Sequence, residues 1–269
     1  MKLKKLLSAL AVSSVFAMGA AHAAPVVVDV NQWDPTPAPG TDGLTAPISF
    51  FALNWSATST YTDNTTNPFG NVGTLGAGDF VVDSGRGSVG YLDAGNATIL
   101  GPENNEGFGF THSMVFDYSG LTGVVAINDG AGGIGAYYSG GTINLRGDTN
   151  ADGIGDVLLM TLGVIGSTGT IGNFTLYTKV TSVMDDVFFL NGAYDFSDLL
   201  VNLQVVVGEA NFNNRGPVPS EINDDPLQWE RTSRLNGNLQ FNVPEPGALA
   251  LLGLGLAGLG FARRNKKQA

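Results

Sequence analysis

The feature that most constrains the fold is a series of short apolar segments separated by turn residues, with no amphipathic helical stretch of useful length between them. Within residues 174–180 and 239–243, apolar and polar side chains alternate, as they do in strands with one buried face. Nine further segments have the composition of strands: residues 26–30, 48–54, 80–83, 88–92, 109–116, 124–128, 142–146, 157–164 and 200–207.

These segments predict one all-β domain, spanning residues 24–243. Glycine pairs and Asn- or Asp-rich turns separate the strands, and a βαβ arrangement would need helices that the sequence does not contain. We therefore expect an antiparallel β-sandwich of jelly-roll type.

Residues 1–23 have the layout of a secretory signal peptide. Lys2, Lys4 and Lys5 form a charged start, residues 6–17 are largely apolar, and small residues precede the predicted cleavage after Ala23. We expect the Sec translocon to export the chain.

The C-terminal segment, residues 244–269, has three parts. Pro244, Glu245 and Pro246 come first, an uncharged apolar stretch follows over residues 247–262, and a basic tail closes the chain. Its cations are Arg263, Arg264, Lys266 and Lys267. The apolar stretch is shorter than the roughly 20 residues that span a bilayer, and the cations favour the cytoplasmic side of the inner membrane. An ordinary single-pass anchor is the alternative.

This three-part tail resembles the PEP-CTERM sorting signal of Gram-negative bacteria. The resemblance implies that an exosortase-type enzyme recognises Pro244, Glu245 and Pro246. It also implies transient anchoring of a hydrophobic sorting helix in the inner membrane, followed by delivery to the cell surface or the extracellular space.

The body between the two ends is strongly acidic. From Ala24 to Pro246 it has six Lys and Arg against 24 Asp and Glu, a formal charge of about −18. Such a charge argues against a nucleic-acid partner, because nucleic-acid binding requires cations that neutralise phosphates. The chain has no cysteine, which excludes disulfides and thiolate chemistry.

Residues 148–156 have the oxygen spacing of a calcium loop. The predicted ligands are Asp148, Asn150, Asp152, the Ile154 carbonyl and Asp156, with Gly153 at the turn. The acidic residue that usually closes such a loop is missing, because Leu159 stands at position 12. Calcium is the only cofactor that the sequence suggests, and the alternative is a polar hairpin loop.

The sequence does not favour an enzyme. A Ser-His-Asp triad would have to use His112, which we expect on the surface or on an edge strand, and no G-x-S-x-G motif accompanies it. Carboxylate pairs suited to glycoside hydrolysis mean little among 24 acidic residues. Trp55 and Trp229 are instead candidates for stacking on sugars, which would make the body a carbohydrate-binding module with calcium-assisted contacts.

From about Gly78 onward, the body is similar to the flocculation-associated PEP-CTERM proteins. The similarity lies in residues 140–145, in residues 169–178 and in the segment 234–242, which leads directly into the sorting signal. It implies a non-enzymatic surface or matrix protein that supports aggregation, flocculation or biofilm formation through exopolysaccharide.

Overall fold

The computed structural model describes residues 25–34, 42–64, 73–95, 98–102, 104–171, 173–201, 207–213 and 217–242. Up to Phe241, these residues belong to one compact unit, Ala23–Phe241. The predicted processing residues Ala23, Pro244, Glu245 and Pro246 lie outside the described residues, as do Arg263, Arg264, Lys266 and Lys267 of the basic tail.

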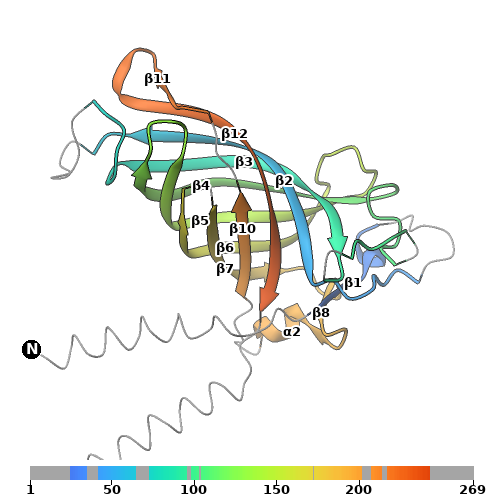
Figure 1. The fold of residues 1–269 in the computed structure, drawn as a ribbon. Coiled ribbons are helices and arrows are strands. Elements are labelled where there is room, and N and C mark those ends of the chain that lie inside the picture. Colours follow the sequence, from blue (N-terminus) through green and yellow to red (C-terminus); the bar gives the residue numbers. More distant parts are fainter. Residues whose placement is uncertain are drawn as a thin grey trace, which may run out of the picture. The chain divides into compact units, whose positions relative to one another are not determined.

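The described chain is built almost wholly of antiparallel strands (Figure 1). The strands are β1 (Val26–Val28), β2 (Phe50–Thr62), β3 (Phe80–Asp93), β4 (Ser113–Asn128), β5 (Ile134–Asp148), β6 (Val157–Thr170), β7 (Asn173–Val183), β8 (Phe188–Leu190), β9 (Tyr194–Asp195), β10 (Val207–Asn213), β11 (Ser220–Ile222) and β12 (Asp225–Asn242). The helical turns are η1 (Val30–Gln32) and α2 (Phe196–Val201).

Most strands belong to one sheet whose order follows the chain. The order is β10-β7-β6-β5-β4-β3-β2-β12-β11, and β10 also pairs with β12. Because β12 contacts β2 on one side and β10 on the other, eight strands form a closed sheet, which removes their free edges. A smaller sheet has the order β1-β8-β9.

This topology confirms the predicted all-β antiparallel fold and changes its connectivity. A jelly roll contains Greek-key crossings, whereas here each strand from β2 to β7 pairs with the next one along the chain. Two walls of the closed sheet face each other across one core, as two sheets of a sandwich do.

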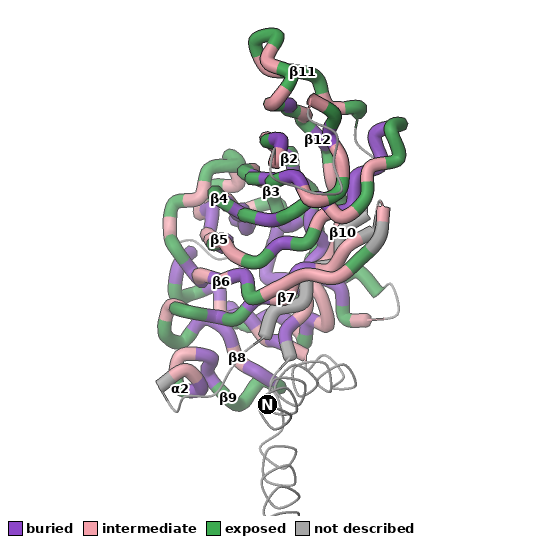
Figure 2. Tube along the Cα trace, turned by 90° about the vertical axis from the view of Figure 1, so that its left-hand side faces the viewer, coloured by how far each residue is buried: buried purple, intermediate pink, exposed green. Residues whose placement is uncertain are grey.

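Buried and exposed residues alternate along strands of the closed sheet (Figure 2). On β3, Val81 and Asp83 are buried, whereas Phe80 and Val82, which alternate with them, are exposed. The core inside the sheet consists mainly of leucines and aromatic residues, among them Leu53, Phe116, Leu145, Leu162 and Leu176.

Several of the predicted short strands are parts of longer ones. The segments 80–83 and 88–92 are both in β3, and 109–116 and 124–128 overlap β4 at its two ends. The glycines of β3 lie within the strand and do not end it. They make room for neighbouring side chains. A Cβ at Gly85 would lie 2.7 Å from the Tyr118 hydroxyl oxygen, and one at Gly87 would overlap Trp55.

The predicted strand 200–207 is wrong at its start. Residues 200 and 201 end the helix α2, Val207 begins β10, and residues 202–206 lie outside the described part of the chain. The short strands β8, β9 and β11 and most of β12 carry too little alternation to be found from sequence. Within the described ranges, no helix is long and apolar enough to cross a membrane.

Aromatic contacts join the small sheet to the closed sheet. Phe196 of α2 packs 6.0 Å from Phe188 of β8 and 5.4 Å from Phe241 of β12, measured between ring centroids. Phe241 in turn lies 5.9 Å from Phe51 of β2. Both contacts of Phe241 are edge to face, and they stabilise the packing beyond the area that the rings bury.

Candidate functional site

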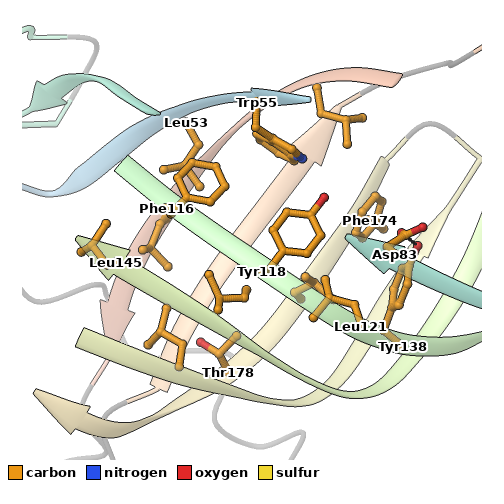
Figure 3. A pocket seen from close by; sticks show the side chains of 15 residues that line it. Leu53, Trp55, Asp83, Phe116, Tyr118, Leu121, Tyr138, Leu145, Phe174 and Thr178 are labelled. Carbon is orange, nitrogen blue, oxygen red and sulfur yellow. Dashed lines mark hydrogen bonds between the residues drawn. The ribbon is translucent and has the colours of Figure 1, made fainter. Parts of the chain in front are cut away.

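A cavity of about 40 Å³ lies inside the closed sheet, in the core (Figure 3). It is lined by Leu53, Trp55, Asp83, Phe116, Tyr118, Leu121, Tyr138, Ile143, Leu145, Leu162, Phe174, Leu176, Thr178, Leu235 and Leu239. Most of this lining is apolar. Figure 3 shows Asp83 and Tyr138 together at one end of the cavity and Leu53 and Leu145 toward the other.

Close packing of β3 against its neighbours shapes this cavity. Because Gly85 has no side chain, the Tyr118 hydroxyl can lie against the β3 backbone. Gly87 similarly leaves space for Trp55 and for Phe116, whose rings contact each other edge to face at 5.8 Å. The glycines therefore allow three aromatic rings to crowd into the interior of a small closed sheet.

Asp83 is the one carboxylate in the cavity lining, and it is 7% exposed. The Tyr138 hydroxyl donates a hydrogen bond to its Oδ2 atom, and the Ser59 side chain also hydrogen-bonds the carboxyl group. Burial raises the pKa of Asp83 and favours the neutral form, and the Ser59 and Tyr138 hydrogen bonds and the Arg231 charge oppose this only in part.

The tyrosines near Asp83 are also held in their neutral form. Burial raises the pKa of Tyr61 to about 12. It raises the pKa of Tyr118 and of Tyr138 well above the ordinary range, and the Asp83 charge acts in the same direction. The buried carboxyl group of Asp83 therefore lies near neutral tyrosine hydroxyl groups.

The predicted calcium ligands lie in the loop between β5 and β6. Asp148 is fully buried, and its Oδ2 accepts hydrogen bonds from Ser113 Oγ and from the Gly153 N–H, both at 2.8 Å. Asp152 accepts a hydrogen bond from the Ile154 N–H at 2.8 Å.

The loop is thus held together by its own backbone donors. Asn150 accepts from the Asp152 N–H, and Asp156 accepts from the Thr149 N–H and hydroxyl, which lower the pKa of Asp156. No group of three or more His, Asp or Glu suited to a metal is found among the described residues. Calcium binding at this loop stays a prediction.

The two candidate tryptophans are both core residues. Trp55 lines the cavity, and Trp55 and Trp229 are each 6% exposed. Stacking on a sugar requires an open ring face, and neither ring offers one at the surface. These indole rings therefore serve packing, and a sugar-binding surface has to be sought elsewhere.

Exposed rings do occur on the outer face of the closed sheet. Phe80 of β3 pairs with Val124 of β4, which pairs with Tyr137 of β5. These three residues, called the outer row below, are 50%, 39% and 54% exposed. Adjacent residues such as exposed Phe80 and buried Val81 point to opposite faces of the strand. The sequence alone does not show which of the two faces is outside.

The sequence predicts His112 on the surface or on an edge strand, and this prediction is wrong. The side chain is fully buried beside Asp34. Its Nδ1 lies 3.2 Å from Asp34 Oδ2 and 3.1 Å from the Thr111 hydroxyl, and its ring contacts Trp33 edge to face. Burial lowers the pKa of His112 despite the acidic neighbours, first among them Asp34. This pair ties the N-terminal segment to the core.

The described strands define an all-β domain with a closed sheet. Residues 242–266 match the PEP-CTERM protein-sorting motif. No curated protein and no solved structure matches the chain. The motif identifies an exported chain that is sorted by an exosortase-type enzyme, anchored transiently in the inner membrane and then delivered to the cell surface or outside the cell.

Proposed function

We propose that the protein is a non-enzymatic component of the cell surface or extracellular matrix that supports exopolysaccharide-associated aggregation, as in flocculation or biofilm formation. The sorting motif is the observation that carries this proposal, because it directs the body to the compartment where exopolysaccharide is found. The resemblance of the body to flocculation-associated proteins is consistent with it.

The outer row gives the body a contact surface for a polysaccharide. Phe80 and Tyr137 lie two strands apart, a separation of about 9–10 Å from strand spacing. The apolar faces of sugar rings pack on aromatic side chains, and Val124 fills the space between the two rings. One extended sugar chain can therefore cross β3, β4 and β5 along this row.

Binding to polysaccharide tests this surface directly. We expect the purified protein to co-sediment with exopolysaccharide from its host, and the Phe80→Ala/Tyr137→Ala variant to be retained about tenfold less. Phe110→Ala is the matched control, because Phe110 is 76% exposed but lies in the loop before β4. Equal retention of all three proteins would exclude the outer row as the binding surface.

Calcium-assisted carbohydrate binding is a second candidate function, which the oxygen-rich loop 148–156 favours. The carboxylates of Asp152 and Asp156 are at the surface, where an ion could reach them. We expect calcium to raise the Tm of the protein, and Asp152→Asn to remove that effect. An unchanged Tm on titration with calcium would exclude calcium-assisted binding at this loop.

A further inference from the structure

We propose that the outer row is part of a longer binding strip for a neutral polysaccharide, one whose sugar units carry no ionised groups. This inference rests on the proposed function, because it names the class of polysaccharide that the same surface takes. It is carried by a line of five paired residues without charge, by the hydroxyl groups beside them and by the acidity of the rest of the body.

The outer row continues across two more strands. Phe80 of β3 pairs with Thr62 of β2, and Thr62 pairs with Gln228 of β12. Directly paired residues of an antiparallel sheet project from the same face, and Thr62 and Gln228 are both exposed, as the outer row is. The line of Gln228, Thr62, Phe80, Val124 and Tyr137, called the five-strand line below, crosses the neighbouring strands β12, β2, β3, β4 and β5 (Figure 1). Four strand spacings give it a length of about 19 Å, which accommodates several sugar units.

Hydroxyl groups lie beside the five-strand line. Thr60 of β2, Val82 of β3 and Thr122 of β4 are paired with one another in a second line, two positions further along the strands. Thr122 is exposed and Thr60 is half-buried. A threonine hydroxyl both donates and accepts, as the hydroxyl groups of a sugar do. The strip therefore presents aromatic rings to the apolar faces of sugars and neutral polar groups to their edges.

The five-strand line contains no Lys, Arg, His, Asp or Glu, and neither does the strand β2. Arg86 of β3 and Arg234 of β12 lie six positions along their strands from the line, about 20 Å away. The side chain of Arg231 instead lies over the Tyr61 ring, 5.7 Å from its centroid, and donates to a backbone carbonyl. On the five described strands, no cation is therefore placed to pair with a carboxylate of a polymer on the line.

The charge of the body argues against both charged classes of polymer. Six Lys and Arg stand against 24 Asp and Glu, and exposed Glu230 lies two positions from Gln228, about 7 Å along β12. A polyuronate would be repelled by this charge and would find no cation on the line. A cationic polymer would be attracted to the whole acidic surface, so its binding would not depend on the line. A neutral polymer is the class that the line itself holds.

Three polymers with a cellulose-type backbone separate these classes. Hydroxyethyl cellulose is neutral, carboxymethyl cellulose is anionic, and chitosan is cationic in mildly acidic buffer. In affinity electrophoresis, we expect hydroxyethyl cellulose to retain the protein equally at low and high salt, because no ion pair is involved. The Phe80→Ala/Tyr137→Ala variant should be retained about tenfold less. Carboxymethyl cellulose should not retain the protein, and chitosan should retain the protein and the variant alike, at low salt only.

A pair of charge variants tests the choice without removing a ring. Thr62→Arg places a cation on the five-strand line, and Ser56→Arg is the matched control, because Ser56 is an exposed residue six positions away on the same strand. We expect carboxymethyl cellulose to retain Thr62→Arg about tenfold more than Ser56→Arg. Equal retention of these two variants would overturn the proposal.

Two results with the wild type would also overturn it: retention by carboxymethyl cellulose as strong as by hydroxyethyl cellulose, and no retention by hydroxyethyl cellulose. Exopolysaccharide from the host, tested alongside, separates this failure from that of the proposed function. Retention by the host polymer through Phe80 and Tyr137, without retention by hydroxyethyl cellulose, would contradict only the neutral class. Failure of the host polymer to retain the wild type would contradict the proposed function itself.

Discussion

The inner and outer faces of β3, β4 and β5 reverse the usual placement of side chains in opposite ways. Inside, Asp83 lies among leucines and aromatic rings in the core. Outside, Phe80, Val124 and Tyr137 turn apolar surface toward solvent. Only three positions along β3 separate the buried carboxyl from the exposed phenyl ring.

The two departures have different physical costs. A buried carboxyl reduces stability, because it loses its hydration. Exposed rings cost little stability and instead favour contact with other molecules. The difference is consistent with our proposal that the outer face, and not the inner one, contacts an external partner.

The largest effect should come from the inner face. Leu162 is 1% exposed and lines the cavity, so Leu162→Ala should reduce the free energy of unfolding by about 2–5 kcal/mol. Chemical denaturation of the purified protein measures this loss. A loss below that of Tyr137→Ala would show that the closed sheet is not the main core.

Tyr138→Phe should cost less, about 1–3 kcal/mol, because it removes the hydroxyl that donates to the buried Oδ2 of Asp83. The double variant Asp83→Leu/Tyr138→Phe should regain most of this loss, since it replaces both polar groups with apolar ones. A double-mutant cycle in urea measures the coupling between the two side chains. Additive effects would contradict the contact.

The dependence of stability on pH sharpens the comparison further. The ordinary pKa of Asp is 3.8, and burial raises the pKa of Asp83 in the folded protein. Above pH 3.8 the folded protein therefore binds more protons at this site than the unfolded chain, and its stability falls as the pH rises through the raised pKa. Asp83→Asn should therefore gain stability relative to the wild type as the pH rises above 3.8.

Asp156 provides a control of opposite sign. Hydrogen bonds from Thr149 lower its pKa, so its contribution to stability is present above the ordinary pKa and is lost as the pH falls through the lowered one. Asp156→Asn should therefore be less stable than the wild type above the ordinary pKa of Asp, and this difference in stability should shrink under acid conditions. If both variants followed the wild type at all pH values, the burial of Asp83 would not govern its titration.

The smallest effect on stability should come from the outer row. Tyr137→Ala removes an exposed ring and should change the free energy of unfolding by no more than about 0.5 kcal/mol. Thermal denaturation checks this alongside the loss of polysaccharide retention. A large loss of stability would mean that the ring packs against the protein rather than serving a partner.

Much of the fold could be predicted from the sequence. Alternation in segments such as 174–180 located the strands, and turn residues between them indicated an antiparallel all-β domain. The strand order could not be predicted, because pairing of β12 with both β2 and β10 depends on contacts between distant segments. The glycines at positions 85 and 87 also led to the prediction of two separate strands, 80–83 and 88–92. In the structure these glycines serve packing within the single strand β3.

The candidate site was harder to predict. Asp83 is one acidic residue among 24, and only the structure shows that it faces inward beside Tyr138. Trp55 looked like a sugar-stacking residue, because sequence does not distinguish a buried indole ring from an exposed one. The sorting signal, by contrast, consists of contiguous residues and could be recognised without the fold.

The most direct test of sorting to the surface is the intact mass of the protein recovered from membrane, surface and culture fractions of its host. We predict a species that begins at Ala24, ends near Pro246 and lies outside the membrane fraction. A membrane-bound species that retains Arg263, Arg264, Lys266 and Lys267 would show that the tail is a permanent anchor. That result would contradict a matrix role for the body.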